Sequence, residues 1–137
     1  MLINYTFTVL LESKLHNIEV SVETCYIPEQ SNALVNEFVF AYTITITNKT
    51  NAIVQLMRRH WIINDSNGEL REVKGEGVVG VQPILEPNES YKYTSGCCLR
   101  TELGKMLGSY EFVNMETRQQ VVVPIPEFQL VAPFKLN

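Results

Sequence analysis

Residues 37–48 alternate between large apolar and smaller side chains without a break, and this pattern constrains the fold more than any other segment. Successive side chains of a β-strand point to opposite faces, so the alternation predicts an antiparallel strand that is buried on one face only. The face expected inside consists of Phe38, Phe40, Tyr42, Ile44 and Ile46. The face expected outside consists of Val39, Ala41, Thr43, Thr45 and Thr47.

Weaker alternation of the same kind recurs along the chain, and no window shows the apolar spacing that an amphipathic helix requires. Turn residues such as Asn67-Gly68 separate the segments, and Pro83 and Pro87 argue against a helix between them. About eight or nine short strands with frequent turns predict an all-β sandwich or barrel. Beyond 37–48, the main strands are expected at residues 18–26, 54–65, 69–74, 91–96, 106–114, 119–125 and 128–131, with a connector at 101–105.

The strand expected at 54–65 carries apolar and cationic residues on both faces, so alternation alone does not identify its buried side. Trp61 is the only tryptophan and offers the largest apolar side chain, and we therefore expect its face to lie inside. On this interpretation Met57 and Ile63 are buried with it. Its expected neighbours across the core are Phe38 or Phe40 and Tyr110 or Phe112.

Length, charge and cysteine content limit the classes of function. The 137 residues suffice for a single domain, 1–137, and the formal net charge is −4. This acidic balance argues against nucleic acid or an anionic membrane as a partner, because both need a basic surface. No apolar run reaches the roughly 20 residues of a membrane helix. Three cysteines are an odd number for a secreted disulfide framework, so we expect reduced thiols and a cytoplasmic protein.

A glycine motif of the form G-x-G-x-x-G is formed by Gly75, Gly77 and Gly80. In dinucleotide-binding folds such glycines let a helix N-terminus approach a pyrophosphate, but no helix pattern follows this motif. We therefore expect a turn or bulge in which at least one glycine has positive φ. A loop whose amide groups bind an anion without a helix is the alternative.

The basic run Arg58-Arg59-His60 lies on the same predicted strand as Trp61. Its side chains could contact phosphate or carboxylate groups, or they could form ion pairs with acidic neighbours. The acidic residues considered for those pairs are Glu72, Glu76 and Glu102. The candidate ligand-binding residues of the chain are thus Gly75, Gly77, Gly80, Arg59 and His60.

Spacing offers no support for a metal site, because the two histidines and three cysteines form no C-x-x-C or H-x-x-x-H pattern. Ser95 and Cys97 could act as nucleophiles, but no histidine and acid are placed to form a triad with them. We therefore assign no catalytic residue, no metal and no cofactor.

Five motifs occur in order between about Ile18 and Leu136: FAYTITI at 40–46, RHWII at 59–63, VKGEGVVGVQP at 73–83, YTSG at 93–96 and IP at 125–126. In these motifs the chain resembles the ApaG family of small bacterial proteins. Residues 1–17 depart from the family pattern, and we expect them to form an N-terminal extension or an extra strand.

The resemblance implies an antiparallel β-sandwich of immunoglobulin or fibronectin-III type. It implies an unknown protein partner, because related domains of F-box proteins and of a polymerase-delta-interacting protein are associated with interactions. It also implies an indirect link to cobalt and magnesium tolerance, and it brings no catalytic activity. We therefore expect a non-enzymatic interaction module. The alternative is a protein that binds a small ligand, a phosphate or a dinucleotide, at the Gly75–Gly80 loop.

Overall fold

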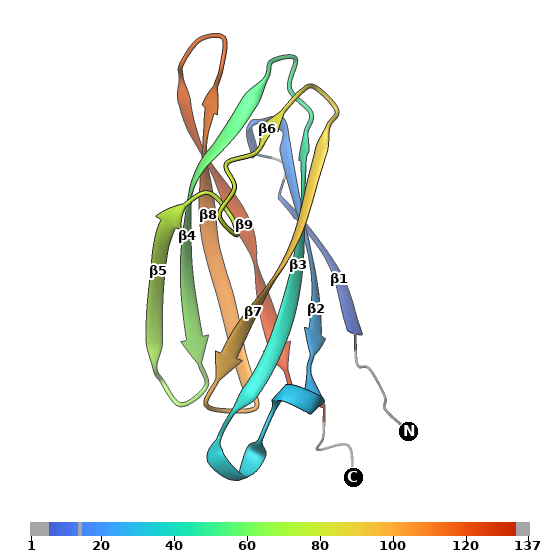
Figure 1. Ribbon diagram of the computed structural model, residues 1–137, viewed down its shortest axis with the longest axis vertical. Helices are drawn as coiled ribbons and strands as arrows, with labels where there is room; N and C mark the ends of the chain where they lie inside the picture. The colour runs from blue at the N-terminus through green and yellow to red at the C-terminus, as the bar shows by residue number, and fades with distance from the viewer. Residues whose placement is uncertain (1–5, 14, 134–137) are drawn as a thin grey trace.

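The computed structural model describes residues 6–13 and 15–133 of the chain. Two antiparallel sheets pack face to face, as Figure 1 shows. The first sheet has the order β1-β2-β3-β7, with β1 (Thr6–Ser13), β2 (Ile18–Tyr26), β3 (Phe38–Asn48) and β7 (Ser90–Leu99). The second has the order β5-β4-β8-β9, with β4 (Val54–Asp65), β5 (Leu70–Glu76), β8 (Leu103–Asn114), β9 (Gln120–Val131) and the short β6 (Ile84–Leu85) paired to β4.

This architecture confirms the predicted antiparallel sandwich of immunoglobulin or fibronectin-III type. The helical segments of the described residues are three short 3-10 turns: η1 (Leu15–Asn17), η2 (Pro28–Gln30) and η3 (Ala33–Val35). Part of the N-terminal segment forms β1, which pairs with β2 and has an irregular register between Val9 and Ser13. Residues 1–5 and 14 lie outside the described residues.

Strand β3 forms the centre of the first sheet, between β2 and β7. Its residues are alternately buried and half-buried along the whole strand, which confirms both predicted faces. Ile44 and Ile46 on the inner face are fully buried. The unbroken alternation of the sequence therefore corresponds to a strand that pairs without a bulge with both of its neighbours, β2 and β7.

Strand β4 is interrupted by a bulge at Met57, which corrects the expectation that Met57 is buried. Leu56 pairs with Phe112 and Arg58 pairs with Glu111, so Met57 is an extra residue opposite β8. The inner face therefore includes Leu56 before the bulge and Trp61 after it, although the two positions have opposite parity. Met57 is half-buried and lies outside the core.

Trp61 is 2% exposed, and it lies at the centre of an aromatic cluster, which confirms that its face is inside. Its ring centroid lies 5.3 Å from Tyr42, 5.9 Å from Phe128 and 6.3 Å from Tyr110, each ring meeting the indole edge to face. Tyr110 was an expected neighbour. On β3 the indole meets the ring of Tyr42, which was not among the expected neighbours. Phe38 and Phe40 belong to the same buried core cluster as Trp61.

Several strand boundaries differ from the predicted ones. The segments expected as two strands, 119–125 and 128–131, are one strand, β9, and the expected connector at 101–105 includes the start of β8. Proline interrupts the sequence pattern of β9 at Pro124 and Pro126, but β9 is an edge strand and its register shifts beside Pro126. An edge strand accepts proline because one side of its backbone needs no partner.

One side of the sandwich is closed by strand contacts, and the other is bridged by a side chain. On the closed side, β1 and β2 contact β9. On the opposite side the edge strands are β5 and β7, and Arg71 reaches from β5 to the backbone carbonyl of Cys98 on β7. The two sheets thus leave a cleft between β5 and β7, which we call the β5–β7 cleft.

Candidate functional site

The glycine loop, residues 77–83, joins β5 to β6 and contains a tight turn. Val78 and Val81 exchange backbone hydrogen bonds of 2.8 and 3.0 Å, and the residues between them, Val79 and Gly80, have φ of 47° and 77°. Positive φ at both central positions defines a type I′ turn. Gly77 also has positive φ, 63°. The predicted glycine turn is confirmed for Gly77 and Gly80.

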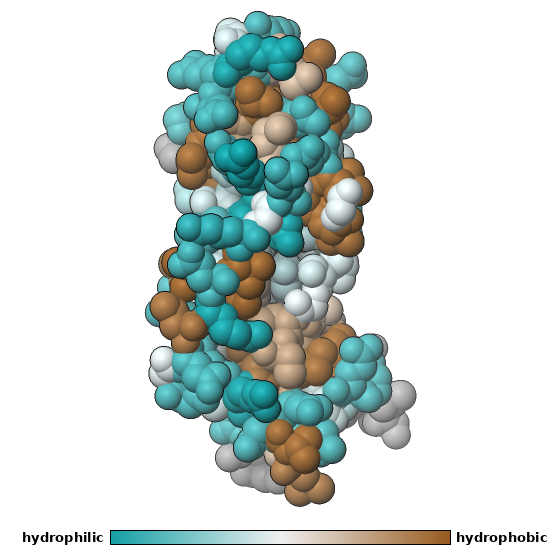
Figure 2. Space-filling view, turned by 60° about the vertical axis from the view of Figure 1, so that its left-hand side comes forward, coloured by the Kyte–Doolittle hydropathy of each residue, from teal (hydrophilic) through white to brown (hydrophobic). Residues whose placement is uncertain are grey.

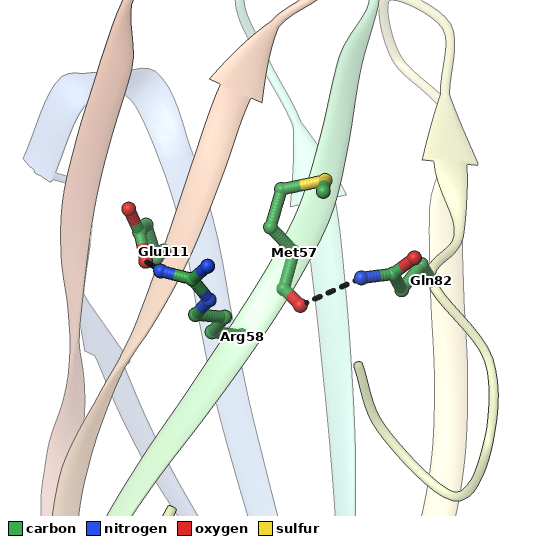
Figure 3. A network of polar contacts seen from close by, with 4 residues as sticks. All are labelled: Met57, Arg58, Gln82 and Glu111. Atoms are coloured by element: carbon green, nitrogen blue, oxygen red, sulfur yellow. Dashed lines mark hydrogen bonds and ion pairs between the residues drawn. The ribbon is translucent and has the colours of Figure 1, made fainter. Parts of the chain in front are cut away.

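The bulge on β4 holds this loop in place. Met57, the extra residue opposite β8, follows the β4–β5 register on its other side, and its carbonyl accepts a hydrogen bond from the Gly77 amide at 2.9 Å. The same carbonyl accepts a second bond, from the Gln82 side chain at 3.0 Å, as Figure 3 shows. The bulge and the loop are thus one structural unit, although Met57 and Gly77 are 20 positions apart in the sequence.

Gly75 lies in β5 rather than in the turn, which corrects one part of the prediction. It pairs with Arg59 across the β4–β5 ladder. A Cβ at this position would lie 2.6 Å from Arg59 Nη1, so the missing side chain makes room for the guanidinium group. Gly75 and Arg59 are therefore one local arrangement, in which the glycine allows the arginine to lie across β5.

The backbone of the loop offers hydrogen-bond acceptors, which suit a cation, rather than free donors, which an anion would need. Arg59 Nη1 donates to the carbonyl oxygens of Glu76 and Gly77, at 3.0 and 3.1 Å. The amides of Gly77, Val78 and Val81 all donate to carbonyl groups of the protein. A phosphate would need such amides as free donors. The loop thus presents carbonyl oxygens to Arg59 and uses three of its amides internally.

The other two members of the basic run lie close to carboxylates, although the buried Nε2 atom of His60 makes no hydrogen bond to a described residue. Arg58 lies 3.5 Å from Glu111 on β8, a partner that the sequence did not indicate (Figure 3). His60 lies 3.4 Å from Glu72, which was one of the expected partners. Glu72 also pairs with Lys74 at 3.2 Å, and the hydrogen bond and charge of Lys74 lower the pKa of the Glu72 carboxyl.

A shallow depression of about 400 Å³ brings together Arg58, Arg59, His60 and Gly75 on the side of β4 and β5. Three of the five candidate ligand residues thus meet in one place. Gly77 and Gly80 lie outside this depression. Its charge is mixed, because Glu76 and Glu111 line it together with the cations, and a mixed lining attracts an anion weakly.

The β5–β7 cleft is a second hollow, of about 250 Å³, and sequence reasoning missed most of it. Trp61 and Met106 line it from the second sheet, Ser95 to Cys98 line it from β7, and Arg59 and Arg71 belong to it as well. Arg71 shares the alternation parity of Val73 and Gly75. Because Val73 pairs with Trp61 of β4, this shared parity would have identified Arg71 as facing the cleft once the pairing of β5 with β4 was known.

Tyr42 and Cys97 line this cleft, and two more buried tyrosines, Tyr93 and Tyr110, lie in the core. Burial raises the pKa of Tyr42, against a hydrogen bond to Ser95 that lowers it. Tyr93 and Tyr110 share a hydrogen bond between their hydroxyls, and burial raises the pKa of both. Burial likewise raises the pKa of the Cys97 thiol, which lies 3.7 Å from Arg71 Nη2. The Cys97 thiol is therefore held in its protonated, weakly nucleophilic form.

Comparisons with known proteins identify the family of this chain. The ApaG domain description matches residues 28–114. A protein from Acidithiobacillus ferrooxidans named Protein ApaG is 50% identical over 115 residues, 84% of this chain and 90% of that protein. The chain belongs to the ApaG family. A second Protein ApaG, from Nitrosospira multiformis, is 46% identical and covers 90% of this chain and 97% of its own length.

A crystal structure of a protein from Bordetella pertussis has a TM-score of 0.82 and 46% identity, covering 85% of this chain and 94% of that one. The ApaG match includes the glycine loop and every residue that lines the β5–β7 cleft. It does not include β1, β2 or β9. Both hollows described above are therefore built mainly from the part of the chain that the ApaG description covers.

The described part of the chain contains no group of three or more His, Cys, Asp or Glu side chains that could hold a metal ion. No helix within the same residues is long and apolar enough to cross a membrane. Among the described residues, Cys25, Cys97 and Cys98 form no disulfide. Cys97 is buried and Cys98 is exposed, because neighbours on one strand point to opposite faces.

Proposed function

We propose that this ApaG-family chain is a non-enzymatic interaction module that presents its glycine loop to a protein partner. The observation that carries the proposal is Val79, a β-branched residue that has φ 47° and is 62% exposed. The left-handed conformation costs such a residue roughly 1–2 kcal/mol, and glycine or asparagine would occupy it more cheaply. Because the exposed side chain gains little from packing, a contact with a partner is the reason we assign to it.

The surroundings of Val79 support a protein rather than a small ligand. Val81 in the same loop and Ile84 at the start of β6 are also exposed. Buried Val78 and the hydrogen bonds to Met57 hold the turn rigid, so its side chains lose little conformational freedom when they bind. On the side of the molecule seen in Figure 2, apolar side chains lie in separate groups among hydrophilic ones. A small preformed contact of this kind suits a regulated, reversible partner.

The substitution Val79→Gly tests the proposal, because it separates stability from function. It removes the exposed side chain and the backbone strain together, so the thermal midpoint should stay or rise by a few degrees. Affinity purification from the source cells should enrich one set of proteins with the wild-type chain and lose that set with Val79→Gly. Val122→Thr, which changes an exposed valine on β9, is the matched control and should retain the set. An unchanged set with Val79→Gly would contradict the proposal.

The alternative function, a phosphate or dinucleotide site at the glycine loop, leads to a separate prediction. Because the amides of Gly77, Val78 and Val81 are already bonded, we expect ATP, NAD and diadenosine tetraphosphate to give no saturable heat at micromolar concentration. Isothermal titration measures this directly. Saturable binding that Arg58→Gln and His60→Gln abolish would establish the depression beside β5 as an anion site.

The family resemblance also bears on location and on metal tolerance. We propose that the chain acts in the cytoplasm and that any cobalt or magnesium tolerance arises through its protein partner. Growth of a deletion strain on cobalt, complemented by wild type or by Val79→Gly at equal abundance, tests this link. Equal rescue by both chains would separate tolerance from the glycine loop.

A further inference from the structure

We propose that the outer edge of β7 is a docking site for an extended acidic peptide, which adds a strand to the first sheet and points its acidic side chains at Arg59 and Arg71. This inference rests on the proposed interaction function and names the chemistry of the partner. It depends on three observations: an open strand edge, two arginines that form no ion pair with a carboxylate of the described residues, and the cleft that both of them line.

The edge of β7 lacks the devices that protect the other sheet edges. β9 carries Pro124 and Pro126, β5 carries four charged residues among seven, and β1 has an irregular register. Over its ten residues β7 carries one charge, Lys92, and no proline, and its register with β3 is regular. Within the described residues, β3 is the one strand that pairs with β7. The long regular edge therefore remains open to a further strand.

The hydrogen bond of Arg71 shows which backbone groups of β7 point away from β3. Its guanidinium donates to the carbonyl oxygen of Cys98 at 2.5 Å from the side opposite β3, so that carbonyl points away from the sheet. Backbone groups of an antiparallel strand alternate in direction, and Thr94 and Gly96 share the parity of Cys98. These residues thus present donors and acceptors to an incoming strand, with small or exposed side chains that do not obstruct it.

The two arginines determine the charge of that strand. Among the described residues, neither Arg59 nor Arg71 forms an ion pair with a carboxylate; their bonds are to the carbonyls of Glu76, Gly77 and Cys98 and to the Cys97 thiol. Inward side chains of a strand added to β7 would enter the β5–β7 cleft, which both arginines line. A carboxylate there would meet a guanidinium in a partly buried site, where charge-assisted hydrogen bonds are strong.

The spacing of the two arginines predicts a sequence pattern. Arg71 and Gly75 are four residues apart on β5, Gly75 lies opposite Arg59, and Val73 lies between them on the same face. Four residues of a strand span about 13 Å, and an incoming strand repeats its inward face every two residues. The expected core of the peptide is therefore acidic–x–apolar–x–acidic, with the apolar residue over Val73.

Binding would also exchange one hydrogen bond. In the free protein the Cys98 carbonyl accepts from Arg71. A peptide amide takes over that acceptor as the new strand forms, and the guanidinium of Arg71 turns to the peptide carboxylate. One acceptor of this open edge is thus occupied by Arg71 until an acidic strand replaces the guanidinium.

The test uses the full chain and short labelled peptides centred on Asp-Thr-Val-Thr-Asp. We expect saturable binding by fluorescence anisotropy, with amide shifts and slowed hydrogen exchange concentrated at Thr94 and Gly96. A peptide with Asn in place of both Asp residues should bind at least about tenfold more weakly. Gly96→Pro should prevent binding while the chain stays folded, because its amide points away from β3 and contributes nothing to that ladder.

A charge reversal makes the test specific for Arg71. Arg71→Glu should lower the affinity for the Asp-Thr-Val-Thr-Asp peptide at least about tenfold. Two mixed peptides carry Lys in place of the first or of the last Asp, and the variant should prefer one of them. The preferred one also reports the direction of the added strand. Lys105→Glu, on β8 and paired to Glu127, is the matched control and should bind as wild type does, because Lys105 lines neither the depression nor the β5–β7 cleft.

Three outcomes would overturn the inference. The first is free aspartate or inorganic phosphate competing at the peptide's own concentration, which would indicate a small-anion site. The second is peptide binding that neither Gly96→Pro nor Arg71→Glu weakens. The third is dimerisation of the chain through β7, abolished by Gly96→Pro, which would make a second copy the occupant. Partner capture through Val79 together with any of these would leave the proposed function in place and remove only the acidic-strand inference.

Discussion

Gly77 and Gly80 both have positive φ, but their surroundings differ. A Cβ on Gly77 would lie 2.2 Å from the backbone oxygen of Val81, whereas a Cβ on Gly80 would have nothing within 4 Å. Gly80→Ala should therefore cost only the left-handed strain, about 1–2 kcal/mol, and Gly77→Ala should cost clearly more because the turn itself must open. Urea unfolding measures both. Gly96→Ala, with ordinary contacts and no positive φ, is the control and should change stability little.

Trp61 is the residue whose removal should damage the core most. Its indole touches the rings of Tyr42, Tyr110 and Phe128, which come from both sheets, so truncation leaves a cavity that neither sheet can fill alone. We expect Trp61→Ala to lower the free energy of unfolding by about 3–5 kcal/mol in chemical denaturation. Ile62→Ala, next along the strand and half-buried, should cost less. Equal losses at the two positions would contradict the assignment of the inner face.

At the scale of the strand, the bulge predicts a difference between two neighbours. Leu56 is fully buried before the bulge, whereas Met57 is the extra residue and lies outside the core. Leu56→Ser should lower the free energy of unfolding by about 3 kcal/mol or more, and Met57→Ser by less than about 1 kcal/mol. Thermal unfolding of the pair measures the difference. A severe loss at Met57 together with a mild one at Leu56 would place the change of parity elsewhere.

The contrast between β3 and β4 shows where the sequence was sufficient. Both faces of β3 followed from alternation because its pairing is regular on both sides. In β4 the buried parity changes at Met57, and a change of parity looks the same in a sequence as a strand with mixed faces. Trp61 was assigned correctly because its size outweighed the mixed pattern, whereas Met57 was assigned wrongly because one parity was applied to the whole strand.

At the scale of the whole molecule, buried tyrosines couple stability to alkaline pH. Burial holds the pKa of Tyr93 and Tyr110 above the ordinary value of 10.0, so the folded chain keeps protons that the unfolded chain releases. Stability from these groups is full below pH 10.0 and is lost as the pH rises further. The double variant Tyr93→Phe, Tyr110→Phe should unfold at higher pH than wild type, followed by circular dichroism. An unchanged alkaline midpoint would show that other groups control it.

The candidate site was predictable only in part, because its two halves depend on different kinds of information. The turn at Gly77 and Gly80 followed from glycine chemistry, which is local. The β5–β7 cleft could be predicted only from the strand order of both sheets. Arg71 and Ser95 line one cleft because β5 and β7 are edge strands on the same side of the sandwich. Strand order is a long-range property, and no spacing in the sequence encodes it.

The pairing of β3 with β7 has a consequence for how the chain must fold during synthesis. Residues 49–89 separate the two strands, so β3 leaves the ribosome well before its partner exists. Until then its apolar, β-branched edge is exposed in the nascent chain, and such long-range pairing is slow to form. Ribosome-bound chains that stop before residue 90 should therefore need a chaperone to remain unaggregated, and those that extend past β7 should need it less.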